Sequence, residues 1–313
     1  MRRRIKLAVM PIVSFMLVLG TSLVARAQER SPYVISAKAG GINAVVGTVT
    51  KARGDSVQQV STADELDSGD RLATASDGRV EMLLMPGSYL RLAENSEIEL
   101  TNASLEWLRL KLVRGMAQIE VTGDDDSRSL IEITTPQTNV RLERKGLYRV
   151  SLPSTNATLV RVRKGRAEVG ATTVKDGKEI TVDQNRVESI SKFDKKSEDA
   201  FDAWDAQRSQ TLTDANRRLS SRSAYSSYGR SGWGRNSFGG YWVYDSFFGS
   251  RTFLPYYTGW SSPYGHRYHL GFGVSRHNHR FGFFGSSGPR LGGFGMSSHR
   301  HVRIVHRGHR IIH

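Results

Sequence analysis

The sequence predicts a mainly β protein, an antiparallel β-sandwich or roll, followed by one amphipathic helix and a largely disordered tail. Three observations favour this fold class. Between Val45 and about Ile190, apolar and polar residues alternate in short runs, as they do in strands that are buried on one face. Turn dipeptides such as Pro86-Gly87 and Asp176-Gly177 separate these runs. After Ser220 the composition changes to glycine, serine, arginine and aromatic residues.

The first 27 residues have the pattern of a secretory signal peptide. Four basic residues precede an apolar run from Leu7 to Val24, and Ala25-Arg26-Ala27 is a small-x-small cleavage motif. An uncleaved membrane anchor is the alternative, for which the length of the run is borderline. We therefore expect an exported protein in the periplasm or at the cell surface, with no transmembrane helix after cleavage. Residues 28–44 then form a linker to the β domain, residues 45–192.

The formal net charge of +15 belongs to the two ends of the chain. From Gln28 to Ala200 there are 25 Lys and Arg against 26 Asp and Glu, and from Phe201 to His313 there are 15 against 4. The chain has no cysteine, which excludes disulfides, thiolate zinc sites and cysteine nucleophiles. All nine histidines lie at or beyond His266, so the predicted β domain cannot hold a Ser-His-Asp triad. We expect no enzymatic activity and no cofactor.

Two turn dipeptides and one weak internal repeat are the basis of the topology that we expect. Pro86-Gly87 predicts a type II turn, and Asp176-Gly177, between ATTV and KEITV, predicts a two-residue hairpin. The segments LVRGMAQI (112–119) and VRKGRAEV (162–169) share the pattern apolar-x-basic-Gly-x-Ala-x-apolar. We expect the two glycines at bends or turns of strands. Because a repeat is typical of solenoids, a short β-solenoid is the alternative architecture.

An ordered set of segments resembles the FecR domain. It comprises SGDRLATASDGRVEMLLMPGSYLRLAENSEIEL (68–100), LKLVRGMAQIEV (110–121), IEITTPQTNVRLERKGLYRVSL (131–152) and ATLVRVRKGRAEVG (157–170). The best-known FecR proteins are anti-sigma regulators, with a cytoplasmic helical segment, one membrane span and a periplasmic FecR domain. Only four basic residues precede the apolar run here, so the chain is more similar to exported, stand-alone FecR-domain proteins. The resemblance implies a β module that binds another macromolecule.

A helix is predicted over residues 197–220. Ser197 is a candidate N-cap, and acidic residues follow it in the first turn, where the helix dipole favours them. Phe201 and Trp204 lie on the same face as three later apolar residues. These two aromatic residues either pack on the β domain, which is the usual source of helix stability, or form part of a partner-binding surface.

Residues 221–313 form a low-complexity segment that is basic and rich in aromatic residues and histidine, for which disorder is the default prediction. Residues 239–269 are dense enough in aromatic residues to form a small β element, with strands at Tyr241–Tyr244 and Thr252–Leu254. His277, His279, His299 and His301 are weak candidates for metal binding. Their spacing matches no closed zinc site, so no specific metal site is expected.

Arginines interleaved with aromatic residues are candidates for binding polyanions. They are Arg276, Arg280, Arg290, Arg300, Arg303, Arg307 and Arg310. For an exported protein the available polyanions are envelope polymers rather than RNA, and attraction of a +11 segment to them needs no specific site.

The leading functional hypothesis is an exported, non-enzymatic envelope binding or scaffold module. Its β domain docks an unknown envelope protein or glycan, its tail associates with anionic polymers, and no specific nucleic acid is expected. A signalling or sensor component of a sigma-factor system is the first alternative, and metal buffering by the histidine-rich tail is the second. Self-association through exposed aromatic residues is possible.

Overall fold

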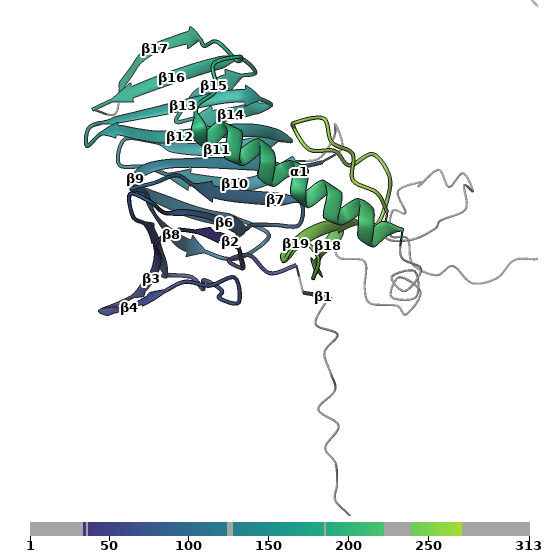
Figure 1. The fold of residues 1–313 in the computed structure, drawn as a ribbon. Coiled ribbons are helices and arrows are strands. Elements are labelled where there is room, and N and C mark those ends of the chain that lie inside the picture. Colours follow the sequence, from purple (N-terminus) through teal and green to yellow (C-terminus); the bar gives the residue numbers. More distant parts are fainter. Residues whose placement is uncertain (1–33, 36, 124–127, 185, 222–238, 271–313) are drawn as a thin grey trace, which may run out of the picture. The chain divides into compact units, whose positions relative to one another are not determined.

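The computed structural model describes residues 34–35, 37–123, 128–184, 186–221 and 239–270, all of which belong to one compact unit (Figure 1). The predicted signal peptide and all of the candidate arginines and histidines from Arg276 onward lie outside these residues. Within the described ranges, no helix is both long and apolar enough to span a membrane.

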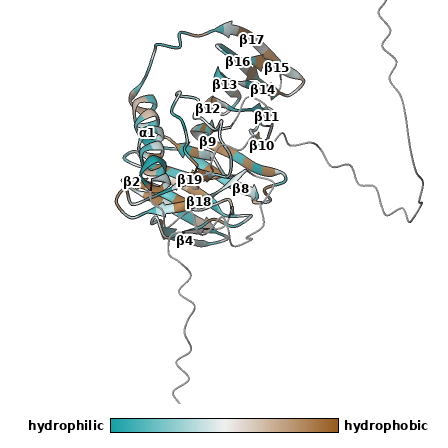
Figure 2. Cartoon of the chain, turned by 90° about the vertical axis from the view of Figure 1, so that its right-hand side faces the viewer, coloured by the Kyte–Doolittle hydropathy of each residue, from teal (hydrophilic) through white to brown (hydrophobic). Residues whose placement is uncertain are grey.

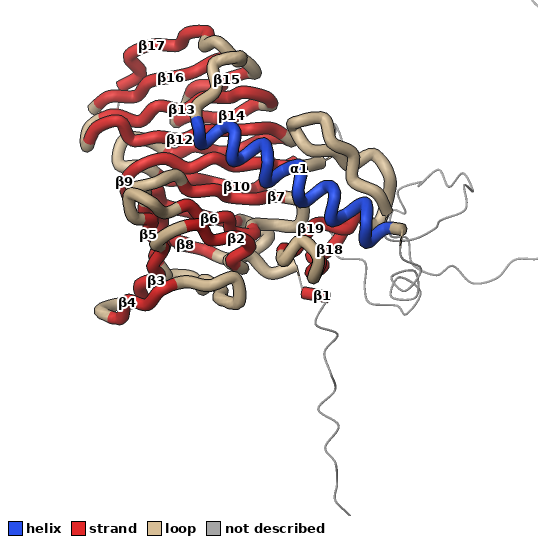
Figure 3. Tube along the Cα trace, viewed as in Figure 1, coloured by secondary structure: helices blue, strands red, loops and turns tan. Residues whose placement is uncertain are grey.

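The described part is mainly β and contains one helix, α1 (Ala200–Ser220), as Figure 3 shows. The strands are β1 (Val34–Ile35), β2 (Ile42–Val46), β3 (Val49–Arg53), β4 (Ser56–Gln59), β5 (Arg71–Thr74), β6 (Arg79–Leu83), β7 (Ser88–Leu92), β8 (Glu97–Asn102), β9 (Leu108–Val121), β10 (Arg128–Thr134), β11 (Asn139–Arg144), β12 (Gly146–Ser154), β13 (Ala157–Lys164), β14 (Arg166–Val169), β15 (Thr172–Lys175), β16 (Lys178–Asp183), β17 (Arg186–Lys192), β18 (Gly240–Asp245) and β19 (Ser250–Pro255).

Sixteen of the strands form one open sheet that folds over into two layers. The helix-side layer, which α1 contacts, has the order β2-β6-β7-β9-β12-β13-β16-β17. The far layer has the order β4-β3-β5-β8-β9-β10-β11-β14-β15. The other three strands form a small sheet, β1-β18-β19. The predicted sandwich or roll is therefore confirmed, in an open form.

The main hydrophobic core lies between the two layers. Leu90 and Ile119 from the helix-side layer and Leu110 and Ile133 from the far layer are fully buried in one cluster. Figure 2 shows the corresponding alternation of hydrophobic and hydrophilic residues along the strands. The period-two pattern of the sequence thus records which side chains enter the space between the layers.

The long strand β9 belongs to both layers. Its first half pairs with β8 and β10 in the far layer, and its second half pairs with β7 and β12 in the helix-side layer. Gly115 lies at the crossing with φ +78°, and an added Cβ there would lie 2.3 Å from Ser96 Oγ. Only glycine therefore fits at this bend.

One strand pair departs from the antiparallel expectation, because β10 runs parallel to β9 with Ile131 opposite Leu108. After β9 the chain returns to the far layer and lies beside the start of the same strand, in the same direction. This is a solenoid-like step within a sheet that is otherwise antiparallel. The β-solenoid, which was the alternative architecture expected from the sequence, thus describes this one strand pair and not the whole sheet.

The predicted hairpin at Asp176-Gly177 is wrong. Strand β15 pairs with β14, whereas β16 pairs with β13 and β17, so the dipeptide carries the chain from the far layer to the helix-side layer. Gly165 marks a crossing in the opposite direction, between β13 and β14. The two similar segments, 112–119 and 162–169, therefore have a glycine at the same position because the chain changes layers at that glycine in both. A two-layer sheet needs such corners, and a turn dipeptide does not distinguish a corner from a hairpin.

The turn at Pro86-Gly87 is the predicted type II turn between the paired strands β6 and β7. Gly87 has φ +82°, and the Ser88 N–H donates to the Met85 carbonyl oxygen over 2.7 Å. A positive φ at the third position of the turn defines this type and explains the glycine.

Two boundaries differ from the predicted ones. Ala39 and Ile42 are fully buried, so part of the segment 28–44, expected to be a linker, belongs to the fold. Helix α1 is capped by Asp199 rather than Ser197, because the side chains of Asp199 and Asp202 each accept the other's backbone N–H. This reciprocal capping box satisfies two donors that Ser197 cannot reach.

The aromatic segment 239–270 is ordered and packed, and strands β18 and β19 confirm the small β element predicted within residues 239–269. Strands β18 and β19 pair with Trp242 opposite Phe253, and both side chains are fully buried. They form a second hydrophobic cluster with Tyr89 of the helix-side layer and Leu212 of α1. These rings therefore cover the outer face of the sheet beside the helix.

Candidate functional site

A row of polar side chains crosses the outer face of the helix-side layer, and we name it the polar ladder. Its members lie directly opposite one another on successive strands: Glu81 on β6, Arg91 on β7, Gln118 on β9, Arg149 on β12, Arg161 on β13 and Glu179 on β16. Their neighbours along each strand point into the core, so the period-two pattern places all six side chains outside it.

Helix α1 covers one end of the polar ladder through charged side chains. Asp202 accepts from Arg149 and Asp205 accepts from Gln118, over 2.5 and 2.6 Å. Arg208 donates to Glu81 over 2.8 Å. Residues three positions apart share a helix face, so the sequence aligns these groups in one stripe.

Arg91 is the centre of a fully buried charge cluster. Its Nε donates to Glu81 over 2.7 Å, and its Nη1 donates to Glu120 over 2.8 Å and to Asp205 over 2.5 Å. All four side chains are completely shielded from solvent. With Arg208 the cluster holds two cations and three carboxylates, so a proton on one carboxylate would balance its charge.

The two glutamates of this cluster have pKa values on opposite sides of the ordinary value. Burial raises the pKa of Glu120 to about 7, because Arg91 offsets this only in part and Asp205 repels a second negative charge. Burial also disfavours the ionised form of Glu81, but Arg208 and Arg91 together lower its pKa to about 2. Glu120 is therefore the group that holds the extra proton near neutral pH.

A carboxyl with a pKa near 7 is a common feature of catalytic sites, but the position of Glu120 favours a structural role. Its side chain has no exposed surface, and Arg91 and Ser209 occupy its oxygens. A general acid or base must reach a substrate, and α1 covers this one. We therefore assign the buried cluster to the seating of the helix.

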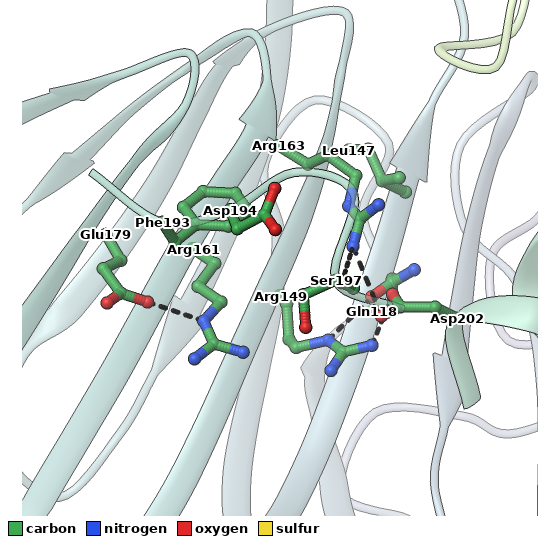
Figure 4. Close-up of a pocket in the computed structure, with 10 residues that line it drawn as sticks. All are labelled: Gln118, Leu147, Arg149, Arg161, Arg163, Glu179, Phe193, Asp194, Ser197 and Asp202. Atoms are coloured by element: carbon green, nitrogen blue, oxygen red, sulfur yellow. Dashed lines mark hydrogen bonds and ion pairs between the residues drawn. The ribbon is translucent and has the colours of Figure 1, made fainter. Parts of the chain in front are cut away.

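A pocket of about 280 Å³ lies where the polar ladder emerges from under the N-terminal end of α1 (Figure 4). Arg149, Arg161 and Arg163 line its floor from strands β12 and β13. Glu179 on β16, the segment from Phe193 to Ser197 and Asp202 on α1 line its walls. We name it the arginine pocket. Its charged lining includes three cations and three carboxylates, Glu179, Asp194 and Asp202.

Two of the three arginines are neutralised by the segment that leads into α1. The Arg149 Nη1 donates to Asp199 over 2.7 Å, and Arg149 holds the pKa of Asp199 at about 2 against the opposing effect of burial. The Arg163 Nη1 donates to the Lys195 carbonyl oxygen over 2.8 Å and to Glu198 over 3.2 Å. Strong charge-assisted pairs of this kind leave little capacity for a ligand.

Arg161 is the open cation of the arginine pocket. Its Nε donates to Glu179 over 2.6 Å, and its guanidinium lies 5.8 Å from the centre of the Phe193 ring. Its two terminal nitrogens have no hydrogen-bond partner among the described residues, and Figure 4 shows no interaction drawn from them. The side chain is 39% exposed, so a ligand can reach this fork.

Comparison with known proteins adds a family to this geometry. Residues 70–168 match the model of the FecR protein family. This segment is a FecR domain. The match covers about a third of the chain and includes the polar ladder from Glu81 to Arg161. Glu179, the Phe193–Ser197 wall and α1 lie beyond it, so the arginine pocket forms between the FecR domain and the residues that follow it.

No curated protein matches the chain. Two crystal structures of a proposed anti-sigma factor from Parabacteroides distasonis ATCC 8503 are similar to it, at 17% and 18% sequence identity. They cover 40% and 47% of this chain, both with a TM-score of 0.34. The chain spans 60% of the first of these proteins and 73% of the second.

The helix residues singled out by sequence lie beside the FecR domain. Phe201 is 3% exposed, and the Arg149 guanidinium lies 5.7 Å from its ring centre. Trp204 stacks on Phe201 with ring centres 5.8 Å apart and is half-buried. The metal-binding candidates His277, His279, His299 and His301 and the seven polyanion-binding arginines lie outside the described residues. Within those residues, no cluster of three potential metal ligands occurs.

Sequence reasoning missed the polar ladder of the FecR domain and its counterpart on α1. It treated charged residues in strands and helices as solvent-facing, the usual case. One signal was available: Asp202, Asp205 and Arg208 recur every three residues on the face that also carries Leu212. A charged stripe beside the apolar stripe of a helix can mark a polar surface beneath it.

Proposed function

We propose that the chain is an exported, non-catalytic binding protein whose FecR domain docks a protein partner through the arginine pocket. The observation that carries this proposal is the open fork of Arg161 in a pocket where Arg149 and Arg163 are already neutralised. An arginine fork matches the two oxygens of a carboxylate, and bidentate pairs of this kind are strong and directional. The expected feature of the partner is an Asp or Glu side chain or a C-terminal carboxylate.

The chemistry of the pocket supports binding rather than catalysis. Asp202 accepts from both Arg149 and Arg163, and Glu179 accepts from Arg161 and from the Ser191 hydroxyl. Both carboxylates are thus already occupied by donors of the chain itself, which favours a structural role for them over contact with a substrate. The Phe193 ring offers an apolar surface for the methylene groups of an acidic side chain, beside the cation that binds its carboxylate.

The proposal is tested by measuring binding of a Glu-rich peptide and of a Gln-rich peptide of equal length to the full chain. We expect the acidic peptide to bind more tightly, and Arg161→Gln to weaken its binding about tenfold or more, because a hydrogen bond to a charged group contributes about 1.5–3 kcal/mol. Arg141→Gln is the matched control, since Arg141 also forms an exposed cross-strand pair, with Glu168. Equal losses in the two variants would contradict a specific site.

A glycan partner is the alternative outcome of the same experiment. A uronic-acid oligosaccharide that binds in an Arg161-dependent way, when the Glu-rich peptide does not, would replace the protein partner by an acidic glycan. Binding of neither probe would remove the pocket from the proposed function.

Export and association with polyanions remain part of the proposal, supported by the leader pattern and by the charge of the segment after Phe201. Full-length chain and a chain ending at Leu270 are compared on immobilised anionic polysaccharide over a salt series. We expect only the full-length chain to bind, with affinity that falls steeply with salt. Binding that ignores salt would contradict this role.

A signalling role is the second candidate, favoured by the FecR match. The proteins best known for this domain regulate sigma factors, and the two similar crystal structures are of a proposed anti-sigma factor. In such a role the partner at the arginine pocket would be another envelope component of the signalling system. A sigma-factor gene beside the gene for this chain would favour this reading.

A further inference from the structure

The two layers of the sheet end unevenly after the FecR domain. The helix-side layer ends with β17, whereas the far layer ends with β15, which precedes β16 in the chain. Strand β15 contacts β16 and β13 of the opposite layer, so the described far layer offers no strand opposite β17. The core between the layers is therefore open on one side at this end.

Two apolar side chains of β17 face this open end. Val187 lies directly opposite Val182, and Ile190 lies directly opposite Ile180. Val182 and Ile180 belong to the buried core, and directly paired residues share a face of the sheet, so Val187 and Ile190 also point to the inner side. They are 48% and 49% exposed. We name this surface the apolar shelf.

The free edge of β15 lies next to the apolar shelf. The Asp176 N–H donates to the Gly165 carbonyl oxygen, which fixes the hydrogen-bonding phase of the β14–β15 pair. Because that phase alternates along an antiparallel pair, Thr172 and Val174 bond to β14. The N–H and C=O groups of Thr173 and Lys175 then point away from β14, toward the position that an additional strand would take.

The charged side chains around this edge that lack a salt-bridge partner among the described residues are positive. Lys178 lies directly opposite Lys192, an unfavourable like-charge pair, and Lys175 precedes Lys178 by three residues. None of these three lysines forms a salt bridge within the described ranges, whereas the adjacent Asp176 is already paired with Lys195. A carboxylate from outside would complement this end of the shelf.

We propose that an extended segment of a partner protein adds to β15 as the next strand of the far layer. Its backbone bonds to Thr173 and Lys175, and its inward apolar residues at alternate positions cover Val187 and Ile190. A carboxylate at one end meets the paired Lys178 and Lys192. Strand addition of this kind uses main-chain hydrogen bonds for affinity and alternate side chains for specificity.

A foreign strand fits this site better than a second copy of the chain. Pairing of β15 with its own copy would bring the sequence TTVK, which has no carboxylate for Lys178 and Lys192. It would also add the Lys175 of the second copy to an edge that is already basic. The surface is distinct from the arginine pocket, so it adds a second contact to the proposed binding function and does not depend on the first.

The test uses the full chain and a soluble peptide with alternating valine and threonine that ends in two glutamates, with a scrambled peptide as control. Thr173→Pro removes the outward N–H and preserves every bond to β14, and Thr173→Ala is the matched control that keeps the N–H. We expect Thr173→Pro to weaken binding of the alternating peptide about tenfold, on the basis of one lost hydrogen bond and the clash of the ring. We expect Thr173→Ala to bind as the wild type does.

A second variant, Ile190→Lys, tests the apolar shelf without altering the β15 backbone, and it should also weaken binding. Arg141→Gln, which removes an exposed arginine outside both sites, should leave binding of this peptide unchanged. Thr173→Pro should leave binding of the Glu-rich peptide unchanged, which separates this site from the arginine pocket. Circular dichroism checks that each variant is folded. Equal affinity of the alternating and scrambled peptides, or equal affinity of Thr173→Pro and Thr173→Ala, would overturn the proposal. So would a concentration-dependent dimer that Thr173→Pro abolishes, because it would make the occupant a second copy.

Discussion

Arg91 shows how a single residue can be buried among charges and still fit the fold. The strand SYLRL offers it as an outward-facing residue, and solvent exposure would be the ordinary outcome. In the structure it is 0% exposed because α1 and the aromatic hairpin cover the outer face of the sheet. Removing one partner from such a cluster leaves a buried charge unpaired. The removal therefore destabilises the protein by more than the intact pair stabilises it.

The raised pKa of Glu120 predicts a pH dependence of stability with a definite sign. The pKa is about 7 in the folded chain and 4.5 in the reference state, so the folded protein binds more protons between these values. The free energy of unfolding should therefore fall as pH rises from about 4.5 to 7, by roughly 3 kcal/mol in total at 1.36 kcal/mol per pKa unit. Urea denaturation at pH 5, 6, 7 and 8 measures this slope.

Glu120→Gln is the variant that isolates this effect, because glutamine keeps the shape and remains uncharged at every pH. We expect its stability to be nearly independent of pH over the same range, and to exceed that of the wild type at pH 8. Glu81, whose pKa is about 2, acts in the opposite sense, and its contribution is lost only as pH falls below about 4.5. A wild-type stability that rises between pH 5 and 7 would contradict the assignment.

At the scale of single elements, β9 holds the two layers together. Gly115 lets one continuous strand serve both layers, and the sequence marks it only as one glycine in an alternating run. The position of the crossing could not be predicted, because a bend and a turn both use glycine. The strands themselves were predicted well from Val45 onward, since their core-facing residues follow period two over most of their length.

Gly115→Ala should destabilise the protein by more than 2 kcal/mol, an order-of-magnitude expectation from left-handed backbone strain and a clash in a packed site. An added Cβ would meet the Ser96 Oγ and the Asn95 carbonyl oxygen, at 2.3 and 2.7 Å. Gly54→Ala is the matched control, because Gly54 also has positive φ but open space around it. Thermal unfolding of the two variants separates the two effects. Gly115→Ala adds backbone strain and a steric clash, whereas Gly54→Ala adds backbone strain alone. Similar losses would show that the crossing tolerates a side chain.

Helix α1 illustrates the limit of amphipathic analysis. Phe201, Leu212, Ala215 and Leu219 are buried as the apolar pattern indicates. Asp202, Asp205, Ser209 and Asn216 are equally buried, and no hydropathy pattern predicts that. Their burial depends on partners that are distant in sequence: Asp202 and Asp205 bond to the polar ladder, Ser209 to Glu120, and Asn216 to the Phe253 and His269 carbonyl oxygens. The arginine pocket was missed for the same reason, since it forms from strand arginines and helix carboxylates that no local motif connects.

At the scale of the whole molecule, packed structure continues beyond the change in composition after Ser220. Helix α1 ends at Ser220, and residues 239–270, where the density of aromatic residues predicted a small β element, pack on the helix and the sheet. Low aliphatic content does not prevent packing when Trp242, Phe253 and Trp260 each bury a large ring on an existing surface. The composition of this segment alone does not show that a sheet is available for these rings to pack against.

A truncation series tests how much the aromatic segment 239–270 contributes to stability. A chain ending at Leu270 should keep the melting temperature of the full chain, whereas one ending at Ser221 should lose several kcal/mol of stability. The shorter chain uncovers Tyr89 and Leu83 on the sheet and Leu212 on the helix, and burial of each large apolar side chain is worth about 1.5–3 kcal/mol. Differential scanning calorimetry measures both chains. Equal stability would show that the hairpin contributes nothing to the folded body.

The charged contact between α1 and the polar ladder has a kinetic consequence. An apolar helix face can slide over an apolar sheet through many small displacements. Here a shift of one turn, about 5.4 Å, would carry Asp205 away from Arg91 and Asp202 away from Arg149, and each stranded ion would cost several kcal/mol. These contacts therefore disfavour intermediate positions of the helix, and we expect α1 to leave the sheet in one cooperative step.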